Sequence, residues 1–149
     1  MEDGCNMKRL LYILSAILVI SGCGKTDGND KPDLKSQLCG DWQSTTLSVS
    51  GKVYLSFNGA GTFEMYQMIG EGAYRLYRGT WNLEEDILTG KYNDGENWAA
   101  SYSVAIDNNT LTLTSKNDAG EVSKYSSCTV PEEVKNGCEV VVKSEDAGL

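Results

Sequence analysis

Few of the side chains that catalyse reactions occur here in a pattern that would support catalysis. The 149-residue chain has no histidine, which is the most frequent general base near neutral pH and the most frequent metal ligand. A cysteine nucleophile would therefore lack its usual partner. The carboxylates of the central region fall in or beside expected turns, where acidic groups are ordinarily solvated: Glu84, Glu85, Asp86, Asp94, Glu96 and Asp107. We predict no enzyme activity, no catalytic residue, no metal and no cofactor.

A surplus of methionine and aromatic residues favours binding chemistry instead. The stretch "MYQMIGEGAYRLY" at 65–77 sets glycines between aromatic runs. Met and Tyr supply deformable apolar surface, and tyrosine hydroxyls can orient a ligand. Any cavity mouth is expected at this stretch, although the same residues could instead form an ordinary packed core. The candidate ligand-binding residues are Met65, Tyr66, Met68, Tyr74, Tyr77, Trp98 and Tyr102.

The segment before Cys23 indicates export. Lys8 and Arg9 precede an apolar run at 10–20, and the small residues Ser21 and Gly22 follow it. This is the layout of a secretory signal. The run is shorter than the roughly 20 residues that a membrane-spanning helix needs. Residues 1–22 are therefore predicted to be a signal peptide, with Met7 as the true start.

The end of this signal, Ile20-Ser21-Gly22-Cys23, resembles the lipobox of bacterial lipoproteins. The resemblance implies cleavage before Cys23 and acylation of its thiol, as by palmitate, which would anchor the protein to a membrane. Residues 23–37 lack apolar periodicity and read as the lipidated cysteine and a flexible tether. The expected location is the bacterial cell envelope, as an outer-membrane lipoprotein facing the periplasm or the surface. The alternative is a soluble secreted protein.

Residues 38–130 must supply the fold that positions any site. Short runs of period-two apolar residues alternate there with turns rich in Asn, Asp and Gly. Eight strands are predicted, at about 41–49, 52–57, 62–69, 73–82, 86–92, 97–106, 110–115 and 121–129. Short hairpins join consecutive strands into a meander.

Closure of this meander removes its exposed edges and buries its apolar face. We therefore predict an all-β fold, an eight-stranded antiparallel up-and-down β-barrel, with a two-sheet sandwich as the alternative. After the barrel, residues 131–149 are expected to form a short helical turn, beginning near Pro131, and a C-terminal tail.

Several motifs within 38–130 resemble the lipocalin family. "LCGDW" carries Gly40-x-Trp42 at the start of the first strand, which is similar to the Gly-x-Trp signature of lipocalins. The motifs that follow, from "SFNGAGTFEMY" to "NTLTLTS", resemble small lipocalin-like lipoproteins of Bacteroidota. The resemblance implies that Trp42 closes one end of the barrel under a basic residue of the last strand, to which Lys124 is the nearest match.

The three cysteines that follow Cys23 suggest one disulfide and one leftover thiol. The first and last strands of a closed meander are antiparallel neighbours, which places Cys39 near Cys128. A bridge between them is the favoured pairing, and Cys138 is the alternative partner. The net charge of −8 leaves no basic stripe for nucleic acid.

Two functions from different classes remain open at this stage. The first is a lipid-anchored barrel that binds a small apolar or amphipathic molecule. The second is a filled barrel that acts as a protein-interaction or accessory module. They differ in the barrel's interior, because an eight-stranded barrel either is filled by its own side chains or holds one small ligand.

Overall fold

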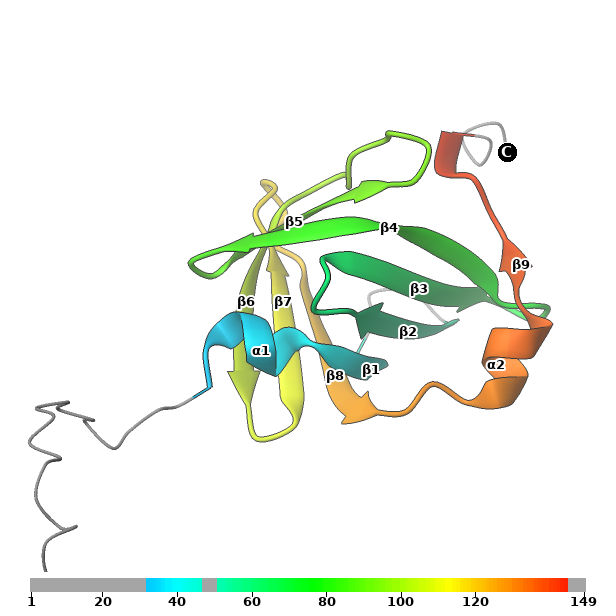
Figure 1. Ribbon diagram of the computed structural model, residues 1–149, viewed down its shortest axis with the longest axis horizontal. Helices are drawn as coiled ribbons and strands as arrows, with labels where there is room; N and C mark the ends of the chain where they lie inside the picture. The colour runs from blue at the N-terminus through cyan, green and yellow to red at the C-terminus, as the bar shows by residue number, and fades with distance from the viewer. Residues whose placement is uncertain (1–31, 47–50, 145–149) are drawn as a thin grey trace, which may run out of the picture. The chain divides into compact units, whose positions relative to one another are not determined.

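The structure is a computed structural model that describes residues 32–46 and 51–144 (Figure 1). The predicted signal peptide, Cys23 and most of the predicted tether lie outside the described residues. No helix among those described is long and apolar enough to span a membrane.

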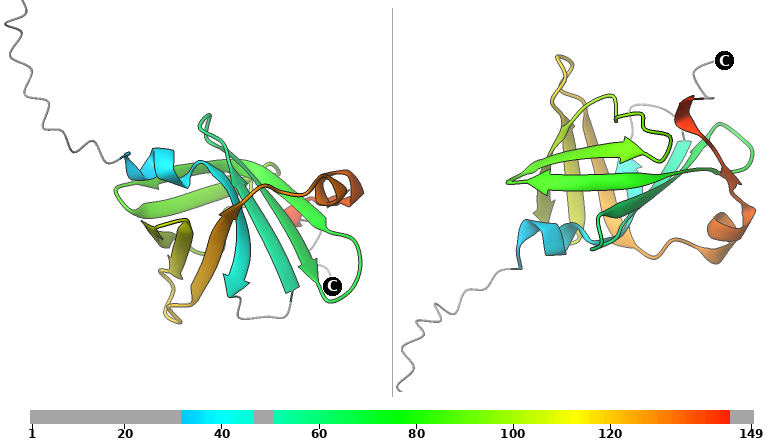
Figure 2. Two further views of the ribbon diagram at one scale, coloured as in Figure 1. Left: turned by 90° about the horizontal axis from the view of Figure 1, so that it is seen from below. Right: turned by 45° about the horizontal axis from the view of Figure 1, so that its top comes forward.

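Eight antiparallel strands form a closed barrel, as the sequence predicted (Figures 1 and 2). Each strand pairs with the next one in the chain, including β3 with β4, and β8 pairs with β1, which closes the barrel. The alternative of a two-sheet sandwich is therefore wrong. The strands are β1 (Gly40–Thr46), β2 (Gly51–Phe57), β3 (Thr62–Ile69), β4 (Arg75–Glu84), β5 (Ile87–Tyr92), β6 (Tyr102–Asp107), β7 (Thr110–Ser115) and β8 (Val122–Cys128).

The barrel wall is least continuous between β5 and β6. These strands pair at two positions only, Ile87 with Ser103 and Leu88 with Tyr102. The sequence predicted a strand from 97, but β6 begins at Tyr102. The β5–β6 loop, residues 93–101, instead folds back on β5, where the backbone N–H of Trp98 donates to the carbonyl of Gly90 at 2.9 Å. The loop therefore lies beside the part of β5 that does not pair with β6.

A short helix, α1 (Leu34–Leu38), covers the end of the barrel at which β1 begins. Asp33 caps it by accepting from the backbone N–H of Ser36 at 2.7 Å. The sequence predicted a flexible tether over 23–37, but this helix occupies the end of that segment. The indole N–H of buried Trp42 donates to the carbonyl of Leu38 at 2.9 Å. Trp42 is thus fixed by the helix. Lys124 is exposed on β8, where it pairs with Thr46, whereas Trp42 pairs with Ser127. Among the described residues, Lys35 lies over an indole ring, 5.6 Å from the Trp81 ring centroid.

The C-terminal strap, residues 129–144, crosses the outside of the barrel. It contains α2 (Glu132–Gly137) and β9 (Glu139–Val140). β9 pairs in parallel with Arg75 and Leu76 at the start of β4. The pairing of β4 with β5 begins only at Gly79, so β9 extends the sheet where β5 does not pair. The strap buries a second, outer cluster against β2, β3 and β4: Tyr54, Tyr66, Leu76, Val130 and Val134.

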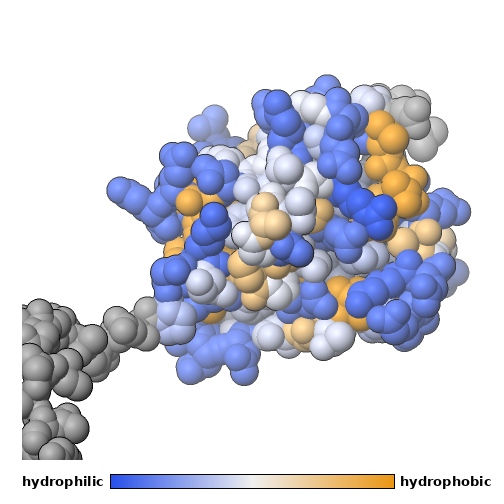
Figure 3. Space-filling view, in the orientation of Figure 1, coloured by the Kyte–Doolittle hydropathy of each residue, from blue (hydrophilic) through white to orange (hydrophobic). Residues whose placement is uncertain are grey.

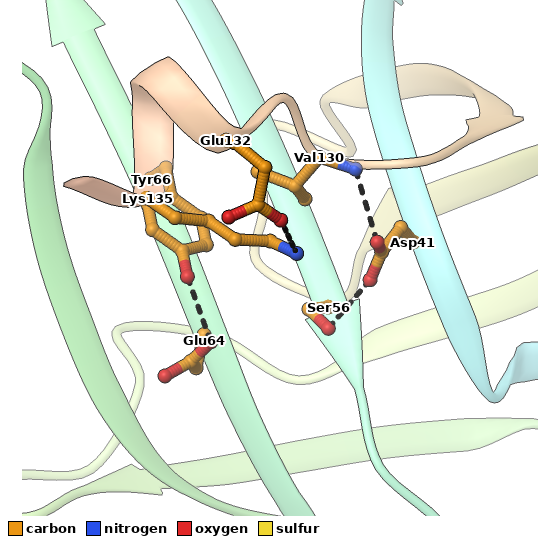
Figure 4. Close-up of polar contacts among 7 residues, drawn as sticks. All are labelled: Asp41, Ser56, Glu64, Tyr66, Val130, Glu132 and Lys135. Atoms are coloured by element: carbon orange, nitrogen blue, oxygen red, sulfur yellow. Dashed lines mark hydrogen bonds and ion pairs between the residues drawn. The ribbon is translucent and has the colours of Figure 1, made fainter. Parts of the chain in front are cut away.

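Asp41, the middle residue of the Gly-x-Trp signature, ties this strap to the barrel (Figure 4). Its carboxylate accepts from the Ser56 hydroxyl at 2.6 Å and from the backbone N–H of Val130 at 3.0 Å. Beneath α2, the Tyr66 hydroxyl donates to Glu64 at 2.8 Å. The outer cluster is therefore held at its edges by hydrogen bonds to carboxylates.

All three cysteines in the described part of the chain are free thiols. Cys39 packs against the inner core, whereas Cys128 and Cys138 pack against the outer cluster. Burial raises the pKa of the Cys128 thiol, with a smaller contribution from the carboxylate of Asp41. The pairing of Cys39 with Cys128, with Cys138 as the alternative partner of either, stays a prediction that peptide mapping without reduction would test.

Candidate functional site

The barrel contains a cavity of about 620 Å³ that opens beside the β5–β6 loop. This volume lies within the roughly 300–1,000 Å³ of typical small-molecule sites. Six strands, the loop and the strap contribute to its lining. The lining residues are Leu55, Phe57, Phe63, Met65, Tyr92, Glu96, Asn97, Trp98, Ala99, Tyr102, Leu113, Ser123, Tyr125, Lys143 and Ser144.

Aromatic rings make up much of the cavity wall. The Phe63 and Trp98 centroids lie 5.0 Å apart and those of Trp98 and Tyr102 lie 6.1 Å apart, both edge-to-face. Phe63 also meets Tyr92 at 5.9 Å. Ring edges and faces carry opposite partial charge, so these rings can pack a further planar ring in the same edge-to-face or offset way. The wall is thus suited to a ligand with planar apolar surface.

Gly90 allows Trp98 to lie against β5. A Cβ atom at position 90 would come within 2.2 Å of the Trp98 ring, so any larger residue would displace the indole. The absent side chain at Gly90 therefore sets the position of one side of the wall.

Hydroxyl groups supply the polar surface of the interior. Tyr92, Tyr102, Tyr125 and Ser123 all line the cavity. Burial raises the pKa of Tyr92 and of Tyr125 to about 12, and that of Tyr102 in the same direction. The Ser123 hydroxyl hydrogen-bonds to Tyr125 and opposes part of that rise. All three phenols are therefore neutral at physiological pH, and each can both donate and accept.

The exposed rim of the cavity comes from two segments that are distant in sequence. Glu96, Asn97 and Ala99 belong to the β5–β6 loop, and Lys143 and Ser144 end the described strap. The Ser144 backbone N–H donates to Asp94 at 2.7 Å. Hydrogen bonds from the backbones of Glu96 and Ser144 lower the pKa of Asp94. The strap is thus fastened to the loop at the mouth.

The structure distributes the seven candidate ligand-binding residues over several environments. Met65, Trp98 and Tyr102 line the cavity. Tyr66 is buried in the outer cluster, and Tyr74 packs against that cluster. The remaining two, Tyr77 and Met68, are not lining residues of this cavity.

Tyr77 lies on β4 with its ring 6.0 Å from that of Tyr92 and 5.4 Å from the ammonium of Lys143. It lines a separate polar hollow that also includes Glu71 and Arg75. Met68 is half-buried on β3, opposite Lys52 of β2. The 65–77 stretch therefore contributes Met65 to the cavity, while the rim is formed by the loop and strap.

Sequence reasoning did not select several lining residues. Phe63, Leu113 and Tyr125 are buried inward-facing residues. Phe63 and Leu113 alternate with period two with other apolar residues of their strands, and this pattern could have predicted them. Lys143 and Ser144 had no such signal, because only the path of the strap brings them to the rim.

Comparison with protein families gives a match to a family profile. The profile described as a lipocalin-like domain matches residues 26–113, more than half of the chain. The chain belongs to the lipocalin-like domain family. No curated protein and no solved structure matches it.

Membership fits the geometry of the barrel. Lipocalin-like domains often bind small hydrophobic ligands and are typically non-enzymatic. The described residues of this lipocalin-like domain contain no group of three or more His, Cys, Asp or Glu side chains that could hold a metal ion.

Proposed function

We propose that this lipocalin-like domain is a lipid-anchored envelope lipoprotein that binds one small apolar or amphipathic molecule inside its barrel. The cavity of about 620 Å³ is the observation that supports binding most strongly. Its deep lining residues Leu55, Phe63 and Leu113 are almost fully buried, whereas charged lining residues stand at the rim. Apolar depth and a polar mouth suit an apolar body with a polar end.

The cavity also favours one of the two functions that the sequence left open. A filled-barrel interaction module needs side chains that occupy the lumen. Here the lumen keeps enough space for a drug-sized ligand. Binding of a small molecule is therefore the better-supported function.

The anchor rests on the sequence alone. Lys8, Arg9, the apolar run at 10–20 and the small residues before Cys23 support export and acylation. Replacement Cys23→Ser should abolish incorporation of labelled palmitate in the native host and release the protein from the membrane fraction. Unchanged labelling would contradict the anchor. Location in the outer membrane and a Bacteroidota type are parts of the same proposal.

Native mass spectrometry of the protein purified from its own envelope tests binding, because a retained small molecule adds its mass to the folded protein. The structure offers a matched pair of variants. Ala99→Trp adds a large side chain at the exposed rim, whereas Ala105→Trp makes the same change at an exposed position of β6 that does not line the cavity.

Ala99→Trp should obstruct the mouth and reduce the bound fraction, while Ala105→Trp should leave it unchanged. Titration with hydrophobic dyes, fatty acids and sterols provides the second measurement. Absence of any retained molecule, together with failure of the whole panel to bind, would reject the proposal.

A further inference from the structure

The interior of the cavity combines a hydroxyl cluster with the absence of a buried charge among its described lining residues. Tyr92, Tyr102 and Tyr125 lie close enough for ionisation of Tyr102 to disfavour ionisation of each of the other two. The lining residues that carry charge are Glu96 and Lys143, and both are exposed. A ligand that reaches the cluster would therefore meet neutral donors and acceptors only.

Tyr102 is the member of this cluster that is available to a ligand. No hydrogen bond among the described residues engages its hydroxyl, and burial and the charge of Glu121 account for its raised pKa. Among the described side chains no polar atom that is closed off from solvent lacks a partner, so this hydroxyl stays accessible, and it belongs to a residue that lines the cavity. Tyr125, in contrast, already hydrogen-bonds to Ser123.

We propose, building on the function proposed above, that Tyr102 is the polar attachment point for an uncharged ligand with fused or planar rings and a hydroxyl or carbonyl oxygen. The rings of the ligand pack against Phe63 and Trp98, which are in edge-to-face contact. Its oxygen reaches the hydroxyl of Tyr102, which can either donate or accept.

The site disfavours an ionised carboxylate for two reasons. Removal of a carboxylate from water without a paired cation costs free energy, and the same desolvation raises the pKa of the tyrosines. Two nearby carboxylates act in the same direction. Asp94 disfavours negative charge on Tyr92, and Glu121 disfavours it on Tyr102. Lys143 is a rim cation and lies over the Tyr77 ring.

Four pyrene derivatives of matched ring size test this selectivity: pyrene itself, 1-pyrenemethanol, 1-pyrenecarboxylate and 1-pyrenemethylammonium. Affinities for the purified protein are measured by fluorescence titration. The alcohol should bind most tightly, and the carboxylate about tenfold or more weakly. Equal affinity for alcohol and carboxylate, or tighter binding of either ion, would overturn the proposed ligand class.

The replacement Tyr102→Phe then tests the attachment point, because it removes one hydroxyl and keeps the ring. Affinity for the alcohol should fall about three- to tenfold, the loss expected for one hydrogen bond, while affinity for unsubstituted pyrene should change less than twofold. Tyr54→Phe makes the same change in the outer cluster and should leave both affinities unchanged. An equal effect on pyrene and on the alcohol would reject Tyr102 as the attachment point.

These outcomes separate the two proposals. If no pyrene derivative binds the wild-type protein and the wider panel also fails, both the proposed function and this inference are rejected. If all four bind with the same affinity, binding stands and the inference fails. If Tyr102→Phe does not fold, the ligand series on the wild-type protein still decides the ligand class.

Discussion

Replacement of Asp41 by alanine should loosen the C-terminal strap and destabilise the domain. The Asp41 carboxylate accepts two hydrogen bonds, from Ser56 at 2.6 Å and from Val130 at 3.0 Å. Hydrogen bonds to charged groups contribute about 1.5–3 kcal/mol each. Because Asp41 is only partly buried, water can replace part of this, so we expect a loss of about 2–4 kcal/mol in the free energy of unfolding. That is a large share of the roughly 5–15 kcal/mol typical of a domain.

The loss should be local before it is global. Val130 is 1% exposed and is the first residue of the strap that belongs to the outer cluster. Without Asp41 its N–H loses its acceptor, so hydrogen exchange at the Val130 amide should accelerate more than exchange at amides of the barrel strands. Urea denaturation measures the global change, and hydrogen exchange measures the local one.

Two further variants make the reasoning refutable. Asp107→Ala removes a carboxylate that is exposed at the end of β6 and should cost less than about 0.5 kcal/mol. Ser56→Ala removes one donor, and its effect should not add to that of Asp41→Ala, because the two side chains share one interaction. A loss below about 0.5 kcal/mol for Asp41→Ala, with unchanged exchange at Val130, would refute this role of Asp41.

Three other perturbations have expected outcomes. Gly90→Ala places a Cβ within 2.2 Å of the Trp98 ring, so urea denaturation should show a loss of about 1–3 kcal/mol; wild-type stability would contradict the close packing. Burial raises the pKa of Tyr125 to about 12, so an absorbance titration should show a tyrosine that ionises late and that Tyr125→Phe removes. The stability that neutral Tyr125 contributes is complete below about pH 10 and is lost as the pH rises through 12. The lowered pKa of Asp94 keeps Ser144 attached above about pH 3.9, and the attachment is lost as the pH falls through the lowered value; the Ser144 amide resonance should shift over that range, and Asp94→Asn should abolish the shift.

The sequence by itself determined the barrel. Alternation such as Val53, Leu55 and Phe57 places one apolar face on each strand, and the short turns leave consecutive strands little choice of partner. Burial of that face and removal of free edges then require closure. These are local rules together with one global constraint, so they can be applied without coordinates. The position of Trp42 was implied instead by the resemblance of its Gly-x-Trp motif to lipocalins, and this tryptophan is buried at the end of the barrel that α1 covers.

The composition of the cavity was decided by tertiary structure. Tyr66 and Met65 are consecutive in β3, yet one lies in the outer cluster and the other in the cavity. Sequence reasoning grouped them because both are apolar and close in the chain, but successive residues of a strand face opposite sides. The outer face of a barrel ordinarily meets water. Here the strap covers part of it, so residues on both faces are buried and composition no longer distinguishes them.

The mouth depends on contacts that are still less local. Trp98 reaches the wall because the β5–β6 loop leaves the strand pattern and packs over Gly90. Lys143 and Ser144 reach the rim because β9 pairs with β4, and a hydrogen bond to Asp94 joins positions 50 residues apart. Such contacts leave no periodic trace in the sequence, since each depends on where the rest of the chain has already been placed.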